Sequence, residues 1–168
     1  ILFGGMPIET AGGAKVRVDG SLALGTWVPD LGIHAEAADL TELERLASNL
    51  YPAILKEPLA PPLRLGGSGA IDARLTRTFS DPRIEGSLRA SDFVLRGETF
   101  GEAEARFVVD RNVATFSPFT AASDGGRLTL TGRLGFGGPL RGQYRFEEFA
   151  ADFDRWRLER VLKFLDFD

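Results

Sequence analysis

Apolar and polar residues alternate with a period of two along much of this chain, and this rhythm restricts the fold more than any other feature. In residues 15–24, Val16, Val18, Leu22 and Leu24 recur at even positions, and mostly polar side chains fill the positions between them. Successive side chains of a β-strand point to opposite faces, so the pattern predicts a strand with one apolar face. The same alternation recurs in residues 70–76, 102–109 and 127–136.

Turn-forming residues separate these stretches, at 29–30, 80–82, 96–98, 110–112, 123–126 and 137–139. Short alternating strands joined by turns predict an antiparallel meander. Glycine accounts for 20 of the 168 residues, and Gly20, Gly86 and Gly132 fall on the apolar face. Glycine within a strand marks a bend or a close approach. We therefore predict a mainly β fold built on an antiparallel, curved sheet.

Two segments carry the spacing of amphipathic helices instead. A helix over residues 39–51 is predicted because leucines recur there at intervals of three and four. Asp39 is placed to cap its N-terminus, Glu42 stands where a capping-box partner belongs, and Pro52 is predicted to end it. A second helix is predicted from about 154 to 167, with Leu158, Val161, Leu162 and Leu165 on one stripe. The two helices either cover part of the apolar face or plug and gate it.

The sequence also repeats itself. Residues 13–25 align without a gap with residues 125–137, and a partial third copy lies at 81–93. Repeated strand–strand–helix units bury their apolar faces by stacking on their neighbours. We predict one elongated repeat domain spanning residues 1–168, with units at about 13–52, 67–120 (partial) and 125–168.

Composition and motifs give no support to catalysis or to nucleic-acid binding. The net charge is −4 and cysteine is absent, so neither a basic surface for nucleic acid nor a Cys-based metal site is expected. The single histidine, His34, is predicted to be an ordinary surface residue. Residues 66–70 lack the last glycine of a nucleophile elbow. The acidic residues between 147 and 154 lack the EF-hand pattern. No catalytic residue, cofactor or metal ligand is predicted.

The large aromatic residues Trp27, Trp156 and Tyr144 leave more than one interpretation open. Aromatic side chains on strands and helices usually pack into cores, and this is our expectation here. Stacking on a sugar is the alternative. For Trp156, which lies between Arg155 and Arg157, contact with a membrane surface is a further one.

The order of the motifs resembles a known family. Residues 81–93 read Asp-Pro-x-Ile-x-Gly-x-Leu-x-Ala-x-Asp-Phe, and the pair at 151–152 precedes the helical pattern at 158–162. Together with the repeated Gly-x-apolar-x-apolar strands, these features resemble the TamB/AsmA-like family of envelope proteins. The resemblance implies an open, barrel-like sheet curled lengthwise (a β-taco) with an apolar interior. It also implies a periplasmic location, an inner-membrane anchor outside this chain, and lipid transport between the inner and outer membranes.

The chain begins without methionine and stops just after a helical pattern, so both ends are expected to be cuts through a longer protein. The expected ligand is a phospholipid or another acyl chain, since each buried CH₂ contributes ~0.8 kcal/mol and a ~16-carbon chain gains on the order of 10 kcal/mol. The alternative is a scaffold that templates outer-membrane proteins through exposed sheet edges, with the outer-membrane assembly machinery as partner. The predicted groove residues are Val16, Val18, Leu22, Leu24, Ile33, Ile71, Leu75, Leu88, Phe107, Val109, Leu128, Leu130, Leu134, Phe136, Tyr144 and Phe146.

Overall fold

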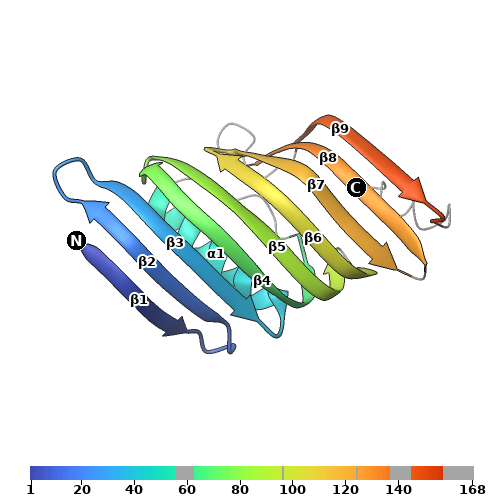
Figure 1. The fold of residues 1–168 in the computed structure, drawn as a ribbon, viewed down its shortest axis with the longest axis horizontal. Coiled ribbons are helices and arrows are strands. Elements are labelled where there is room, and N and C mark those ends of the chain that lie inside the picture. Colours follow the sequence, from blue (N-terminus) through green and yellow to red (C-terminus); the bar gives the residue numbers. More distant parts are fainter. Residues whose placement is uncertain (56–62, 96, 124, 137–144, 157–168) are drawn as a thin grey trace.

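The described strands form a single antiparallel sheet. The structure, a computed structural model, describes residues 1–55, 63–95, 97–123, 125–136 and 145–156. Nine strands follow one another across the sheet in sequence order, and one helix lies between the third and fourth (Figure 1). The elements are β1 (Leu2–Glu9), β2 (Lys15–Ala23), β3 (Val28–Ala37), α1 (Leu40–Leu55), β4 (Leu65–Thr78), β5 (Asp81–Leu95), β6 (Glu98–Asp110), β7 (Val113–Ser123), β8 (Gly126–Gly135) and β9 (Arg145–Asp154). The prediction of a mainly β, antiparallel fold is confirmed.

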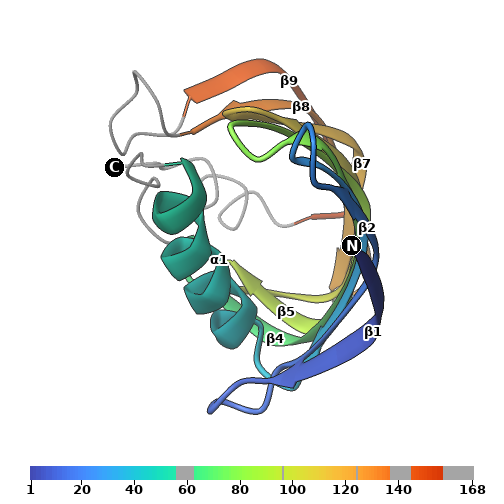
Figure 2. The ribbon, with the colours of Figure 1, turned by 90° about the vertical axis from the view of Figure 1, so that its left-hand side faces the viewer.

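The sheet is strongly curved. Figure 2, which looks along the sheet from the β1 end, shows the strands bent into an open C with α1 on its concave side. The unit predicted at 13–52 contains β2, β3 and most of α1, and the unit predicted at 125–168 contains β8 and β9. Strands β4 to β7 lie between them, with the partial copy at 81–93 in β5.

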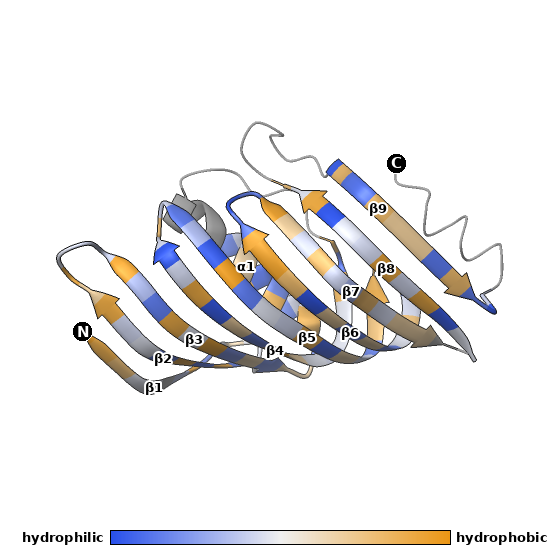
Figure 3. Cartoon of the chain, turned by 45° about the horizontal axis from the view of Figure 1, so that its top comes forward, coloured by the Kyte–Doolittle hydropathy of each residue, from blue (hydrophilic) through white to orange (hydrophobic). Residues whose placement is uncertain are grey.

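The strand register explains the period-two pattern. One row of cross-strand partners is apolar through every strand and consists of Ile8, Val16, Ala35, Ile71, Leu88, Ala105, Phe119, Leu130 and Ala151. The adjacent row faces the other way and includes the exposed side chains of Lys15, Glu36, Arg89 and Glu104. Figure 3 shows the resulting alternation of hydrophobic and hydrophilic bands along the strands. The apolar row lies on the concave face, because most of its central members are buried in one cluster with Leu40 and Leu43 of α1.

Two glycines that align in the repeat, Gly20 and Gly132, have positive φ angles within their strands. Gly20 has φ +124° and Gly132 has φ +155°. A Cβ on Gly20 would lie 2.1 Å from the carbonyl oxygen of Asp30 on the neighbouring strand. A side chain at position 20 would clash with this carbonyl oxygen, so the close approach of the two strands requires glycine there.

Helix α1 begins where the sequence predicted. The Asp39 carboxylate accepts a hydrogen bond from the backbone N–H of Thr41 at 2.9 Å, which is the geometry of an N-cap. The capping box was a wrong prediction, because the Glu42 carboxylate pairs with Arg45 at 2.5 Å. Pro52 does not end the helix, which continues to Leu55. A proline removes one backbone hydrogen bond, and within a final turn the remaining bonds carry the helix on.

The helix is fastened to the concave face near the start of β4. Leu40 is only 1 % exposed and packs over Gly69, where a Cβ would lie 3.1 Å from the Leu40 Cδ2 and 2.6 Å from the carbonyl oxygen of Arg89. The Glu44 carboxylate accepts hydrogen bonds from the backbone N–H groups of Leu63, Arg64 and Leu65. The helix therefore packs against the sheet at β3 and β4.

Loss of the cap gives a measurable prediction for this helix. Asp39→Ala is expected to lower the free energy of unfolding by about 1 kcal/mol, because the N–H of Thr41 loses its acceptor. Urea unfolding followed by circular dichroism measures the change. Asp39→Ser restores an acceptor oxygen and is expected to behave nearly as the wild type. Equal destabilisation by both substitutions would contradict the capping role.

The second predicted helix is wrong at its start. Asp154 is the last residue of β9, where Phe153 still pairs with Leu128 of β8 and Asp154 with Arg127. The ladder to β8 supplies hydrogen bonds that override the local helical pattern. The stripe of Leu158, Val161, Leu162 and Leu165 lies outside the described residues.

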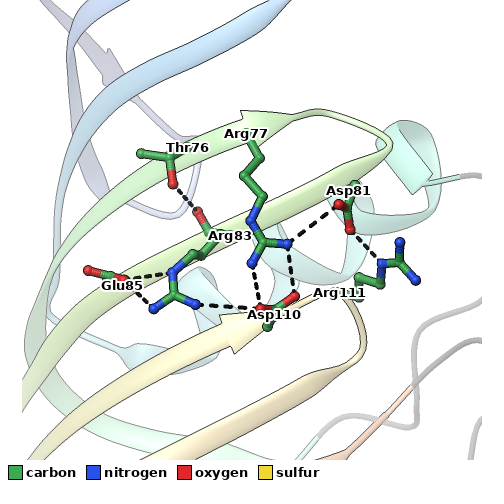
Figure 4. Close-up of polar contacts among 7 residues, drawn as sticks. All are labelled: Thr76, Arg77, Asp81, Arg83, Glu85, Asp110 and Arg111. Atoms are coloured by element: carbon green, nitrogen blue, oxygen red, sulfur yellow. Dashed lines mark hydrogen bonds and ion pairs between the residues drawn. The ribbon is translucent and has the colours of Figure 1, made fainter.

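An ion-pair network ties two hairpin ends together at one rim of the sheet (Figure 4). Arg77, at the end of β4, donates to the Asp110 carboxylate of β6 at 3.1 and 2.5 Å. Arg111 donates to Asp81 at 2.5 Å. Hydrogen bonds from Arg77 and from Arg111 lower the pKa of Asp110 and of Asp81, respectively. The ion pairs therefore join the β4–β5 hairpin to the β6–β7 hairpin across this rim.

Candidate functional site

An apolar groove remains open on the concave face. Its volume is about 260 Å³, and its wall exposes no polar atom. The lining comes from β4 to β9 and from one residue that precedes β4. It consists of Leu63, Leu65, Ile71, Leu88, Phe93, Leu95, Ala105, Phe107, Phe116, Phe119, Leu130, Thr131, Gly132, Arg133, Leu134, Phe146 and Phe149. Drug-sized ligands occupy pockets of about 300–1,000 Å³, so the space fits part of an elongated apolar molecule.

A β-bulge in β7 places two phenylalanines in this groove. Phe116 pairs with Phe107, and Phe119 pairs with Ala105, so three residues of β7 advance against two of β6. In a regular strand, residues three apart face opposite sides. The extra residue in the bulge restores them to the same side, and both rings line the groove.

Strand β9, at the edge of the described sheet, contains a similar β-bulge. Leu134 pairs with Phe146, and Thr131 pairs with Ala150, with a register shift between them. Glu148 takes a positive φ of 48° in the extra position. The rings of Phe146 and Phe149 consequently meet on the concave side in an edge-to-face pair, with centroids 5.4 Å apart. They are 41 % and 38 % exposed, so they form an accessible lip of the groove.

A third register shift, in β5, places Phe93 in the groove. Ala90 pairs with Ala103, but Phe93 pairs with Gly101, and Asp92 between them has φ 51°. The Phe93 ring lies 5.8 Å from that of Phe119, between centroids, and is 3 % exposed. The floor of the groove is therefore a packed aromatic cluster, whereas its lip at β9 is open.

The structure divides the predicted groove residues into several groups. The groove is lined by Ile71, Leu88, Phe107, Leu130, Leu134 and Phe146. The buried residues Val16, Leu22 and Leu128 lie in the sheet core and do not line it, while Val18, Ile33, Leu75 and Val109 are half-buried on the same face. Leu24 lies in the β2–β3 turn and is 52 % exposed, and Phe136 follows the end of β8. Tyr144 lies outside the described residues.

Several lining residues were missed by the sequence reading. Phe93, Phe116, Phe119 and Phe149 were omitted, because strict alternation assigns residues three apart to opposite faces. The available signal was a pair of phenylalanines three apart, at 116/119 and at 146/149. Such pairs indicate a bulge wherever both rings must reach one apolar face.

The two tryptophans differ. Trp156 packs into the aromatic cluster, with its ring 5.7 Å from that of Phe100, as expected. Trp27 does not pack into the core, because it lies in the turn between β2 and β3 and is 61 % exposed.

His34 lies on the convex, polar face and has partners that the sequence did not identify. The register places it opposite Asp72 of β4. Its Nδ1 lies 2.6 Å from an Asp72 carboxylate oxygen, and its Nε2 lies 3.0 Å from one of Glu36. These hydrogen bonds, with Asp72 first and Glu36 second, raise the pKa of His34 above its ordinary value. Within the described residues no group of side chains is arranged to hold a metal ion.

This arrangement predicts a pH dependence of stability. The folded-state pKa of His34 is raised above about 6.5, the ordinary value, so its contribution is complete below that pH and is lost as pH rises through the folded pKa. We expect wild type to exceed His34→Gln in unfolding free energy at about pH 5.5 more than at about pH 8.5. Urea unfolding at both values measures this. In the Asp72→Asn background the pH dependence should weaken, and an unchanged difference would contradict the pairing.

No helix in the described part of the chain has both the length and the apolar composition required to cross a bilayer. Comparison of the chain with protein-family models, with curated proteins and with solved structures finds no match.

Proposed function

We propose that the concave groove binds the acyl chains of phospholipids and that this chain forms part of a lipid conduit between the inner and outer membranes. The observation that carries the proposal is the groove wall, which exposes no polar atom yet opens to the surface at Phe146 and Phe149. A binding and transfer role of this kind involves no chemical step, and we propose that the chain is not an enzyme.

An apolar groove wall favours apolar ligands over polar ones. A hydrocarbon chain gains roughly 25 cal/mol for each Å² of apolar surface removed from water. A polar ligand would lose its hydration without receiving a hydrogen bond in return. The groove therefore discriminates by polarity and leaves a phospholipid head group in solvent. This predicts broad selectivity among phospholipids.

The resemblance to the TamB/AsmA-like family, drawn from residues 81–93 and the repeat, points to the same function. On this proposal the curved sheet is one stretch of a β-taco in the periplasm. The anchor is the inner-membrane segment that the resemblance implies. Strands β1 and β9 end the described sheet, and further strands of a longer conduit would pair there.

Native mass spectrometry of the purified 168-residue chain tests the proposal. Phospholipid that co-purifies and dissociates only at raised collision energy is the expected result. Chain-length variants of one phospholipid class should bind with affinities that rise with acyl length, because the apolar area buried rises. A chain that remains free of lipid after incubation with phospholipid would overturn the proposal.

The exposed edges support a second candidate, a scaffold for assembling outer-membrane proteins. Most residues of β9 are exposed, and its outer edge has no partner strand within the described residues. An edge of this kind pairs with an added strand through backbone hydrogen bonds. Binding of unfolded barrel peptides by the lipid-free chain, together with protection of β9 amides from hydrogen exchange, would favour the scaffold over the conduit.

A further inference from the structure

The turn that joins β2 to β3 exposes an apolar tip at one end of the sheet. Leu24 is 52 % exposed, Trp27 61 % and Val28 37 %. No charged residue occurs between Asp19 and Asp30. The strand register places both carboxylates below the tip, because Asp19 pairs with Gly32 and Asp30 with Ser21. Figure 1 shows the turn projecting beyond the neighbouring strand ends.

The backbone of Trp27 is unusual for its residue type. Its φ is +53°, a left-handed conformation that bulky side chains rarely adopt and that turns normally assign to glycine or asparagine. Two other residues at hairpin ends share this conformation, Arg77 with φ 65° and Arg111 with φ 54°. Their guanidinium groups form the rim ion pairs. The Trp27 side chain is instead directed largely into solvent, so folding of the turn does not account for an indole there.

We propose that the Trp27 hairpin, residues 23–28, docks this end of the sheet on the surface of a bilayer of zwitterionic phospholipid. Indole rings favour the head-group region of a membrane, where one part of the ring is apolar and the N–H finds water or a lipid oxygen. The inference extends the proposed function by placing the sheet at a membrane, and it does not require the groove to hold lipid.

The charges near the Trp27 hairpin indicate which kind of bilayer it would contact. The nearest charged residues along the hairpin are acidic, and the Asp30 carboxylate is already engaged by Arg74 through two hydrogen bonds of 2.7 Å. The whole chain carries a net charge of −4. The N-terminal ammonium of Ile1, which donates to the carbonyl oxygen of Leu22 at 2.8 Å, offsets the Asp19 carboxylate. The tip therefore carries little net charge to attract anionic lipid, and docking depends on the apolar side chains.

The experiment uses the full chain and vesicles of phosphatidylcholine. Trp156→Phe leaves Trp27 as the remaining one of the two tryptophans. We expect vesicles to shift its emission to shorter wavelength, and brominated acyl chains to quench it most strongly when the bromines lie near the head groups. In the otherwise wild-type chain, Trp27→Ser should weaken vesicle flotation by about tenfold or more, because a large apolar side chain leaves the interface.

Ile8→Ser is the matched control, because Ile8 on β1 is also exposed, at 46 %, but lies near the opposite end of its strand from the tip. It should leave flotation unchanged. Unaltered Trp27 emission with vesicles, equal weakening by both substitutions, or several-fold stronger binding on adding phosphatidylglycerol would each overturn the inference. Lipid counted by native mass spectrometry in Trp27→Ser separates the two proposals. If lipid co-purifies but vesicles leave the hairpin unaffected, only this inference fails; if the hairpin docks and no lipid co-purifies, only the groove proposal fails.

Discussion

Phe149→Arg is expected to empty the groove of phospholipid while leaving the chain folded. Phe149 lines the groove at its lip and is 38 % exposed. The guanidinium can reach solvent in the free protein, so the free energy of unfolding should fall by about 1 kcal/mol or less. A bound acyl chain would bury the guanidinium charge, and this desolvation costs several kcal/mol. Native mass spectrometry should therefore show a loss of bound lipid of at least about tenfold, since each 1.4 kcal/mol is a factor of ten.

Ala150→Arg provides the matched control for this loss. Ala150 is exposed on the same strand and pairs with Thr131, on the opposite face from Phe149. It adds the same charge to the convex side and should retain wild-type lipid. Arginine at Leu130 is a poorer probe, because Leu130 is 8 % exposed within the core cluster and its replacement would unfold the sheet. Wild-type lipid content in Phe149→Arg would contradict the assignment of the groove.

Gly86→Val is expected to lower the free energy of unfolding by about 3 kcal/mol. A Cβ at this position would lie 2.5 Å from the carbonyl oxygen of Asp72 and 2.9 Å from Cζ of Phe107. The ring can move, but the carbonyl belongs to the paired strand and cannot move without breaking the ladder. Intrinsic strand propensity favours valine over glycine, so the tertiary contact and the propensity predict opposite signs. Urea unfolding measures which one prevails.

Gly4→Val is the control for strand propensity. Gly4 lies in β1, and a Cβ there would meet nothing within 4 Å. We expect this substitution to be neutral or slightly stabilising. Phe107→Leu should recover part of the loss in Gly86→Val, because it removes one of the two contacts. Equal stability of the two glycine variants would show that the close approach to Asp72 is not real.

The β-strands and the sidedness of the sheet followed from the sequence, because a period of two has only one geometric meaning in an extended chain. Val16 and Leu130, which the alternation assigned to the apolar face, fall in one cross-strand row. The start of α1 followed as well, since an Asp before a leucine-spaced segment supplies the acceptor that the first turn lacks. These are local properties, and nearby residues are enough to determine them.

The groove residues were harder to predict, because bulges depend on both strands of a pair. Phe116 and Phe119 reach one face only because β6 opposes them with one residue fewer. The same is true of Phe146 and Phe149 against β8. The start of the second predicted helix is another such case, since pairing of Asp154 with Arg127 extends β9 where the local pattern favoured helix.

The sequence alone determined an antiparallel meander with one apolar face, because alternating residues place their side chains on opposite faces wherever a strand forms. Tertiary structure decided which apolar residues are sealed in the core and which line an open groove. Helix α1 packs against β3 and β4, and the bulges turn extra rings into the groove on the same face of the sheet. That division depends on how the strands are offset from one another and on where a neighbouring element lies, and neither is encoded in the periodicity of one segment.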